Sequence, residues 1–219
     1  MKSLWQFRLF VLVVFIVVGG ISVCNLAAEF LRPLPLPLAT ELGTPPSADQ
    51  LSRASRSALI APFRSDLRAD YALRLTGQAL NATKSARQEN ASEVPFDLLG
   101  SALAMSPHDS RMWLALALLG QRGVVARPVD TLKMSYLTGQ NGADLIPLRL
   151  ASATTTNVLT DVDLKELAQG DVRALLTRLQ NQRAVLADAY AKASPVGAAF
   201  LEASVKTIDP SFLDIMKKK

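Results

Sequence analysis

The chain has 219 residues, with 24 Lys and Arg, 19 Asp and Glu, one His and one Cys. A single cysteine excludes an internal disulfide and a cysteine-ligated metal site, and a single histidine excludes paired-histidine metal sites. The net charge of +5 includes Lys2, Arg8 and the terminal run 217–219, and the remainder is close to balanced. With only 6% aromatic residues, the chain lacks the basic face with interleaved aromatics that binds nucleic acid, so no nucleic-acid partner is predicted.

Residues 1–8 are predicted to be cytoplasmic and residues 9–28 to form a transmembrane anchor. No charged residue lies between Arg8 and Glu29, and the polar stripe of a soluble helix is missing. About 20 apolar residues, each rising about 1.5 Å, cover a hydrocarbon core of about 30 Å. Lys2 and Arg8 precede the apolar run, so the positive-inside rule places everything after it outside the cytoplasm.

A cleaved signal peptide is the alternative to an anchor. It needs a shorter apolar stretch and small residues one and three positions before the cut. Near the end of the apolar run, only a cut after Cys24 comes close to this requirement, because it places Cys24 one position and Ser22 three positions before the cut. The sequence therefore favours an uncleaved anchor, with the lipid bilayer as the partner of residues 9–28.

Residues 29–47 are predicted to form a proline-rich linker. Proline alternates with leucine over residues 33–38, which blocks helix and favours an extended polyproline II strut. Ser47 or Asp49 is placed to cap the next helix. Directly after a membrane span, a stiff spacer is a better interpretation than the alternative, a proline-rich ligand for a partner.

From Ala48 onward the chain is predicted to be all-helical. Apolar residues recur at spacings of three and four, and almost no alternation of period two is found. The polar segment 83–92 is predicted to be a loop. Helices are predicted over residues 48–60, 65–82, 94–105, 109–121, 128–138, 143–157, 163–178, 182–192, 195–207 and 210–216.

An internal repeat with a spacing of 42 to 45 residues, varied by small insertions, lies within the helical region. A fainter echo follows after about 33 residues, where Leu103 corresponds to Tyr136. Each unit is a helix, a tight turn and a second helix, which cannot bury its apolar face alone and must stack on neighbours. The two clearer copies share serine, proline, aromatic and glycine positions at Ser57, Pro62, Ser65, Tyr71 and Gly77 and again at Ser101, Pro107, Ser110, Trp113 and Gly120.

The second copy resembles a tetratricopeptide repeat (TPR), in which a small residue and a proline-containing turn close one helix and a large residue opens the next. The resemblance covers roughly a third to a half of the chain, and the repeats are degenerate. It implies TPR-like stacked hairpins over residues 48–158, followed by a C-terminal helical cap over residues 159–219. The residues that carry it are Phe96, Leu98, Leu99, Ala102, Leu103, Ser106, Pro107, Asp109, Trp113, Leu116, Ala117 and Gly120.

As a whole the chain is similar to membrane-anchored, TPR-like proteins of alphaproteobacteria. This resemblance implies a single-pass protein of the inner (plasma) membrane. Its C-terminal domain is then expected in the periplasm.

No catalytic, cofactor-binding or metal-ligating residue is predicted, and no cofactor. His108 lies in a turn before Asp109, which is placed to cap the next helix. Catalysis by His108 is the alternative and would need a positioned partner within hydrogen-bond reach. Trp113 and Tyr136 are predicted to be core residues, with a place in a concave groove as the alternative for one of them.

An acidic stretch near residue 165 is interpreted as structural. A calcium loop would need oxygen ligands at alternate positions around a glycine, and that pattern is missing. Carboxylates at a helix start, facing the positive end of the helix dipole, explain the stretch better, and Asp171 after Gly170 is expected to restart a helix. The threonine cluster 154–156 is interpreted as an exposed helix end. The acidic residues are Asp161, Asp163, Glu166 and Asp171.

The predicted function is a protein-protein interaction or scaffolding module with a protein partner, because stacked hairpins present a continuous concave surface. The alternative is a structural subunit of an envelope assembly, such as polysaccharide export or secretion. An envelope enzyme is the third class and is disfavoured, because no glycine-rich phosphate loop or nucleophile elbow is present.

Overall fold

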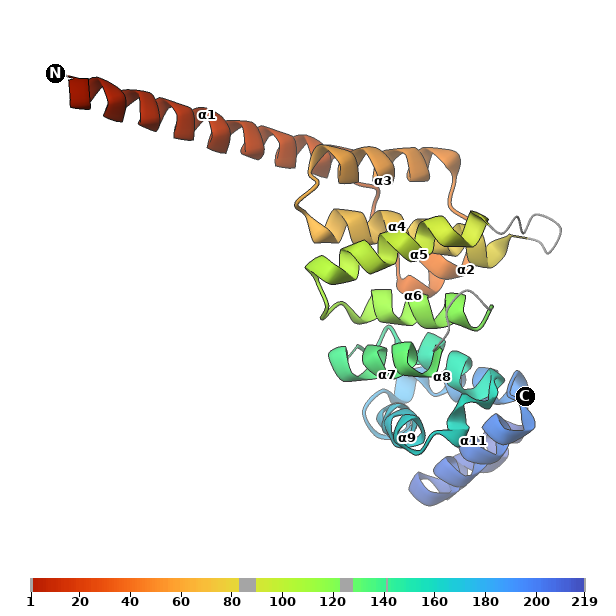
Figure 1. Cartoon of the computed structure of the whole chain (residues 1–219). Helices are drawn as coiled ribbons and strands as arrows, with labels where there is room; N and C mark the ends of the chain where they lie inside the picture. Colours follow the sequence, from red (N-terminus) through yellow and green to blue (C-terminus); the bar gives the residue numbers. More distant parts are fainter. Residues whose placement is uncertain (1, 83–89, 123–127, 141, 219) are drawn as a thin grey trace.

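The computed structural model describes residues 2–82, 90–122, 128–140 and 142–218, and every regular element in those ranges is a helix. The predicted all-helical fold class is confirmed. Helix α1 (Lys2–Leu31) projects away from layers formed by α3 to α7, and α8 to α12 complete the far end of the domain (Figure 1).

The elements after α1 are short to medium helices, and their bounds follow the predicted ranges to within about four residues from Ala48 onward. The ranges 48–60 and 128–138 coincide with α3 and α7. In chain order the helices are α2 (Leu38–Gly43), α3 (Ala48–Ile60), α4 (Ser65–Asn81), α5 (Asn90–Met105), α6 (Ser110–Gly120), α7 (Pro128–Thr138), α8 (Ile146–Thr155), η2 (Asn157–Thr160), α9 (Val162–Thr177), η3 (Gln180–Gln182), α10 (Ala184–Ala191), α11 (Pro195–Ile208), η4 (Pro210–Phe212) and α12 (Leu213–Lys217).

Side-chain caps fix several helix starts. At α3, Gln50 N donates to Ser47 Oγ at 3.2 Å while Ser47 N donates to Gln50 Oε1 at 2.9 Å, which makes a capping box. At α6, Arg111 N donates to Asp109 Oδ1 at 3.0 Å. These caps satisfy backbone N–H groups that a helix leaves without partners in its first turn, and both were predicted from the sequence.

The predicted linker 29–47 is partly wrong. Helix α1 runs on to Leu31, and Pro37, with φ −54° and ψ 138°, has a polyproline II backbone. Directly after it, α2 forms and buries Leu38 and Leu42. These leucines are four residues apart and therefore share one helix face, so the segment after the last proline of the alternating run packs into the domain.

The predicted helix restart at Asp171 is also wrong, because α9 continues through Gly170 without interruption. A glycine within a helix costs only about 1 kcal/mol, and burial of the opposite face of α9 outweighs that. Asp171 is itself buried in the helix middle.

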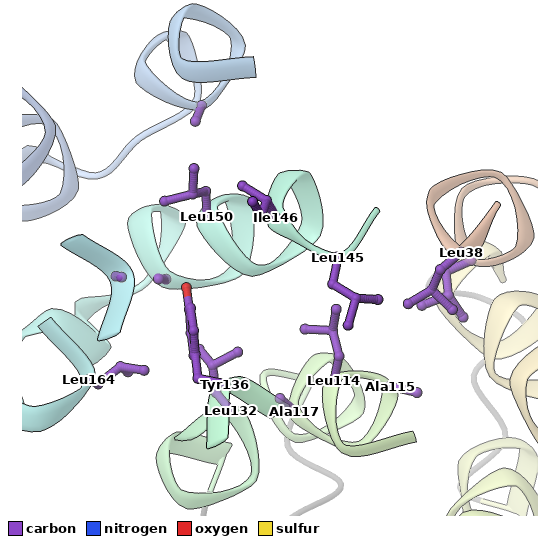
Figure 2. Close-up of a cluster of buried hydrophobic side chains, with 14 of the residues drawn as sticks. Leu38, Leu114, Ala115, Ala117, Leu132, Tyr136, Leu145, Ile146, Leu150 and Leu164 are labelled. Atoms are coloured by element: carbon purple, nitrogen blue, oxygen red, sulfur yellow. The ribbon is translucent and has the colours of Figure 1, made fainter. Parts of the chain in front are cut away.

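Layers α3 to α7 pack side by side, with α4 contacting α3, α5 and α6, and α6 contacting α7. Helix α8 does not continue this side-by-side stacking, because it contacts α6, α9, α10 and α11. Figure 2 shows part of the resulting core: Tyr136 extends from α7 toward α8, whereas Leu150 points away from α7 on the other side of α8. In the same view Leu145 points toward Leu114, so the core is continuous between the two halves of the domain.

Candidate functional site

Helix α1 carries a continuous apolar surface. Its side chains from Trp5 to Cys24 are exposed to solvent in the isolated chain. Within the described residues, Trp5–Leu31 is the one stretch long and apolar enough to cross a membrane, a character that an N-terminal signal sequence shares. A soluble domain has no reason to leave this much apolar surface uncovered.

The last turns of α1 are docked on the helical domain. Ala28 is fully buried and packs with Ala61 and Leu67, and Ile60 lies beside this cluster. Helix α1 therefore shares an apolar contact with α3 and with the start of α4 before it ends.

Ion pairs surround this apolar contact. Arg32 Nη2 lies 2.7 Å from Asp70 Oδ2, and Arg32 Nη1 lies 3.3 Å from Asp66 Oδ2. Arg64, at the start of α4, reaches back to Glu29 Oε2 at 2.7 Å and to Asp66 Oδ2 at 2.5 Å. The Arg64 hydrogen bond and the charges of both arginines lower the pKa of Asp66, against the opposite effect of burial. Partly exposed pairs add little individually to the free energy of unfolding, but together they join the end of α1 to the start of α4.

Helix α2 is held by buried polar contacts. Glu41 and Arg74 are both almost fully buried, and Arg74 Nη2 lies 3.4 Å from Glu41 Oε1 and donates to the Leu34 carbonyl at 3.0 Å. Burial raises the pKa of Glu41, and the charge of Arg74 acts in the opposite direction. At Gly77 a Cβ would stand 2.4 Å from the Glu41 carbonyl oxygen, so glycine is needed for this close approach of α2 to α4.

A second buried polar cluster joins α7, α8 and α9. Arg149 is fully buried; its Nε donates to Ser135 Oγ at 3.0 Å, its Nη1 to the Gly139 carbonyl at 2.9 Å, and its Nη2 to the Ser135 carbonyl. The guanidinium also lies over the Tyr136 ring, 4.9 Å from its centroid. Burial raises the pKa of Asp171 to about 7, opposed by the charge of Arg149 and by the Tyr136 hydroxyl. The arrangement places one buried cation where α7, α8 and α9 meet.

Two adjoining hollows lie beside this cluster, and a wider groove lies further along the domain. Tyr136 and Asp171 border a hollow of about 270 Å³, which shares Gln140 and Arg178 with a neighbour of about 310 Å³. The groove, of about 690 Å³, runs between α9 and α11 and is lined by Phe200 among others. These surfaces are concave enough to receive side chains of a partner.

His108 is exposed in the turn between α5 and α6. Among the described residues it has neither a hydrogen bond nor an ion pair, whereas Asp109 caps α6 and pairs with Arg111 at 2.7 Å. The interpretation of this turn as structural is confirmed for Asp109.

The acidic stretch divides into two parts. Asp161 caps α9 by accepting from Leu164 N at 2.9 Å, and Lys133 Nζ lies 2.7 Å from Asp161 and 2.9 Å from Asp163. The interpretation as helix-start carboxylates is thus confirmed for these two residues. It is wrong for Asp171, which belongs to the Arg149 cluster. Across the described ranges, no three His, Cys, Asp or Glu side chains gather in a way that would hold a metal ion.

The threonine cluster is not uniformly exposed. Thr155 is exposed as predicted, but Thr154 is fully buried, and its carbonyl accepts from Ser194 N at 2.9 Å and Ser194 Oγ at 3.0 Å. A Cβ at Gly197 would stand 2.1 Å from that carbonyl oxygen. The contact of α11 with the end of α8 was missed, because only the fold brings Gly197 and Thr154 together.

The two aromatic residues of the repeats differ in burial. Tyr136 is buried, as predicted. Trp113 is only partly buried at the edge of the core, and its Nε1 donates to the Pro107 carbonyl at 2.8 Å. The prediction of Trp113 as a core residue is therefore met only in part: its side chain packs against the core but keeps some exposure.

Comparison with protein-family models, curated proteins and solved structures finds no match to this chain.

Proposed function

We propose that the chain is a single-pass membrane protein whose helical domain acts as a protein-interaction or scaffolding module outside the cytoplasm. The observation that carries the proposal is the junction at Ala28, where an exposed apolar helix is fixed to the domain by packing and by the Arg32 and Arg64 ion pairs. Because the helix is attached to the domain in this way, its depth in a membrane also sets how far the domain lies from that membrane. The same junction supports an uncleaved anchor, because the passable cut after Cys24 lies inside α1, just before its docked turns.

The scaffolding role is supported by the layered helices and by the concave surfaces between them. Layers of helices that each contact only near neighbours offer extended surfaces to partner chains, and the groove between α9 and α11 adds an apolar recess. In this proposal the domain is TPR-like, the membrane is the inner membrane, and the domain lies in the periplasm. Lys2 and Arg8 before the apolar run support this orientation.

A subunit of an envelope assembly is a second candidate. Gly19 and Gly20 leave the surface of α1 open, with no atom within 4 Å of an added Cβ, which would let another membrane helix approach closely. Partners in that case would crosslink through α1 rather than through the domain.

Two measurements on the full chain test the proposal. The protein should remain in the membrane during alkaline carbonate extraction, and a reporter that works only outside the cytoplasm should be active after Lys219. The same reporter placed before Met1 is the matched control and should be silent. Release of a shortened chain at alkaline pH would overturn the anchor, and an active reporter before Met1 would invert the topology.

Crosslinking in intact cells tests the scaffolding role. We expect reproducible recovery of at least one envelope protein with the full chain. Recovery of no partner, together with turnover of an envelope substrate by the purified protein, would replace the scaffold by an enzyme. Adducts mapped to α1 alone would favour the assembly subunit.

A further inference from the structure

Exposed apolar side chains surround the point where α1 joins the domain. Phe63, in the turn between α3 and α4, is 89% exposed, and Leu59 on the last turn of α3 is 75% exposed. Phe30 and Leu34, at the end of α1 and just after it, are 80% and 84% exposed. Single exposed apolar residues are ordinary on protein surfaces, but four around one junction need a reason.

The depth of this turn relative to a bilayer follows from the junction. Residues 9–28 fill a hydrocarbon core of about 30 Å, which places Ala28 at its outer edge. Ala28 packs with Ala61, and Glu29 pairs with Arg64 at 2.7 Å. Phe63 lies between Ala61 and Arg64 in the chain, so it is held at the level of the lipid headgroups. Figure 1 shows the turn between α3 and α4 on the side of the domain that α1 reaches.

The turn is also built to tolerate a poorly hydrated layer. Pro62 has no backbone N–H, and its carbonyl accepts from Arg68 Nη2 at 3.2 Å. The Ala61 carbonyl accepts from Arg64 N at 3.0 Å. Two carbonyls of the turn therefore have partners within the protein, which lowers the cost of placing them in a poorly hydrated layer.

We infer that the turn between α3 and α4 is a second membrane contact, in which Leu59 and Phe63 enter the interfacial layer of the bilayer that α1 spans. The inference rests on the proposed function, because it requires α1 to be in the membrane. The domain would then lie directly on the bilayer, and α1 would not be its only attachment. Aromatic side chains are favoured at this depth, and the exposed Arg56 on α3 adds attraction to anionic lipid.

Lipid-quenching of a fluorophore on the full chain tests the inference. In a Cys24→Ser background, Phe63→Cys carries the fluorophore, and the protein is reconstituted into phosphatidylcholine vesicles with a quarter or so phosphatidylglycerol and nitroxide lipids. Leu59→Cys is the second reporter, since both side chains are exposed and leave the core untouched. Gln78→Cys is the matched control; it is exposed near the opposite end of α4, about 20 Å away at about 1.5 Å per residue.

We expect nitroxide lipids to remove most of the fluorescence at positions 59 and 63 and little at position 78. Val17→Cys, in the middle of α1, reports insertion of the anchor separately. Quenching at 17 with position 63 no more quenched than position 78 would overturn the membrane contact and leave the proposed function standing. Absence of quenching at 17 would overturn the anchor itself. If the fluorophore at position 63 is shielded only at high protein concentration and is not quenched by nitroxide lipids, a second copy of the chain covers this surface and the inference is refuted.

Discussion

Replacing glycine by alanine at two helix positions should change stability in opposite directions. At Gly170, on the exposed face of α9, no atom lies within 4 Å of the added Cβ. Alanine is the better helix former by about 0.8 to 1.0 kcal/mol, so Gly170→Ala should raise the free energy of unfolding by nearly that amount. At Gly77 the same methyl group would stand 2.4 Å from the Glu41 carbonyl oxygen and 3.5 Å from the Leu42 Cα.

The clash at Gly77 involves backbone and cannot be relieved by turning a side chain. Helix α2 must move by about 1 Å to restore ordinary contact, and overpacking of this kind costs typically about 1 to 3 kcal/mol. The movement also separates the buried Glu41 from Arg74, which leaves two charges poorly compensated. Subtracting the gain in helix propensity leaves a loss of about 0 to 2 kcal/mol from overpacking. The weakened Glu41–Arg74 pair adds to this loss, so Gly77→Ala should still lower the free energy of unfolding.

Thermal unfolding of the two full-length variants, followed by circular dichroism in the same detergent, measures the difference. About 2 to 4 °C per kcal/mol is expected for a domain of this size, so Gly77→Ala should melt several degrees below the parent and Gly170→Ala slightly above it. If both variants melt above the parent, α2 does not pack on α4, and the interpretation of residues 29–47 as a spacer would return.

Three further predictions concern the aromatic and buried polar residues. Trp113→Ala should lower the free energy of unfolding by about 2 kcal/mol, less than the roughly 3 to 5 kcal/mol typical of a fully buried tryptophan. Trp113→Phe loses only the hydrogen bond to the Pro107 carbonyl and should lower it by about 1 kcal/mol. If both variants melt at the same temperature as the parent, the observed packing of Trp113 is contradicted. Arg149→Met should cost about 3 to 5 kcal/mol in denaturant unfolding, because it leaves the buried Ser135 carbonyl and the partly buried Gly139 carbonyl without their donor. A neutral effect would refute the cluster. Because the pKa of Asp171 is raised from 3.8 to about 7, its stabilising contribution is complete below about pH 4 and is lost as pH rises through 7. Asp171→Asn should remove that fall from the profile of unfolding midpoint against pH, and an unchanged profile would show that Asp171 does not titrate in this range.

The helices and their ends were largely determined by local sequence. Apolar spacing of three and four located the helices from Ala48 onward, and the caps at Ser47 and Asp109 were readable because each satisfies N–H groups only two or three residues away. The apolar run of α1 was equally local, since its length and lack of charge need no knowledge of the rest of the chain.

Contacts between distant segments were decided only by the tertiary structure. Three contacts join residues far apart in the sequence: the packing of α2 against Gly77, the burial of Asp171 near Arg149, and the close approach of Gly197 to Thr154. No local pattern encodes such partners, because a helix face becomes buried only when another element covers it.

The junction of α1 with the domain shows the same division. The sequence by itself determined that an apolar helix precedes a proline-rich segment and a helical domain. Only the tertiary structure decided that Ala28, Arg32 and Arg64 fix this helix to α3 and α4, because the ion pairs that hold it join residues more than 30 positions apart and form only once the helices have packed.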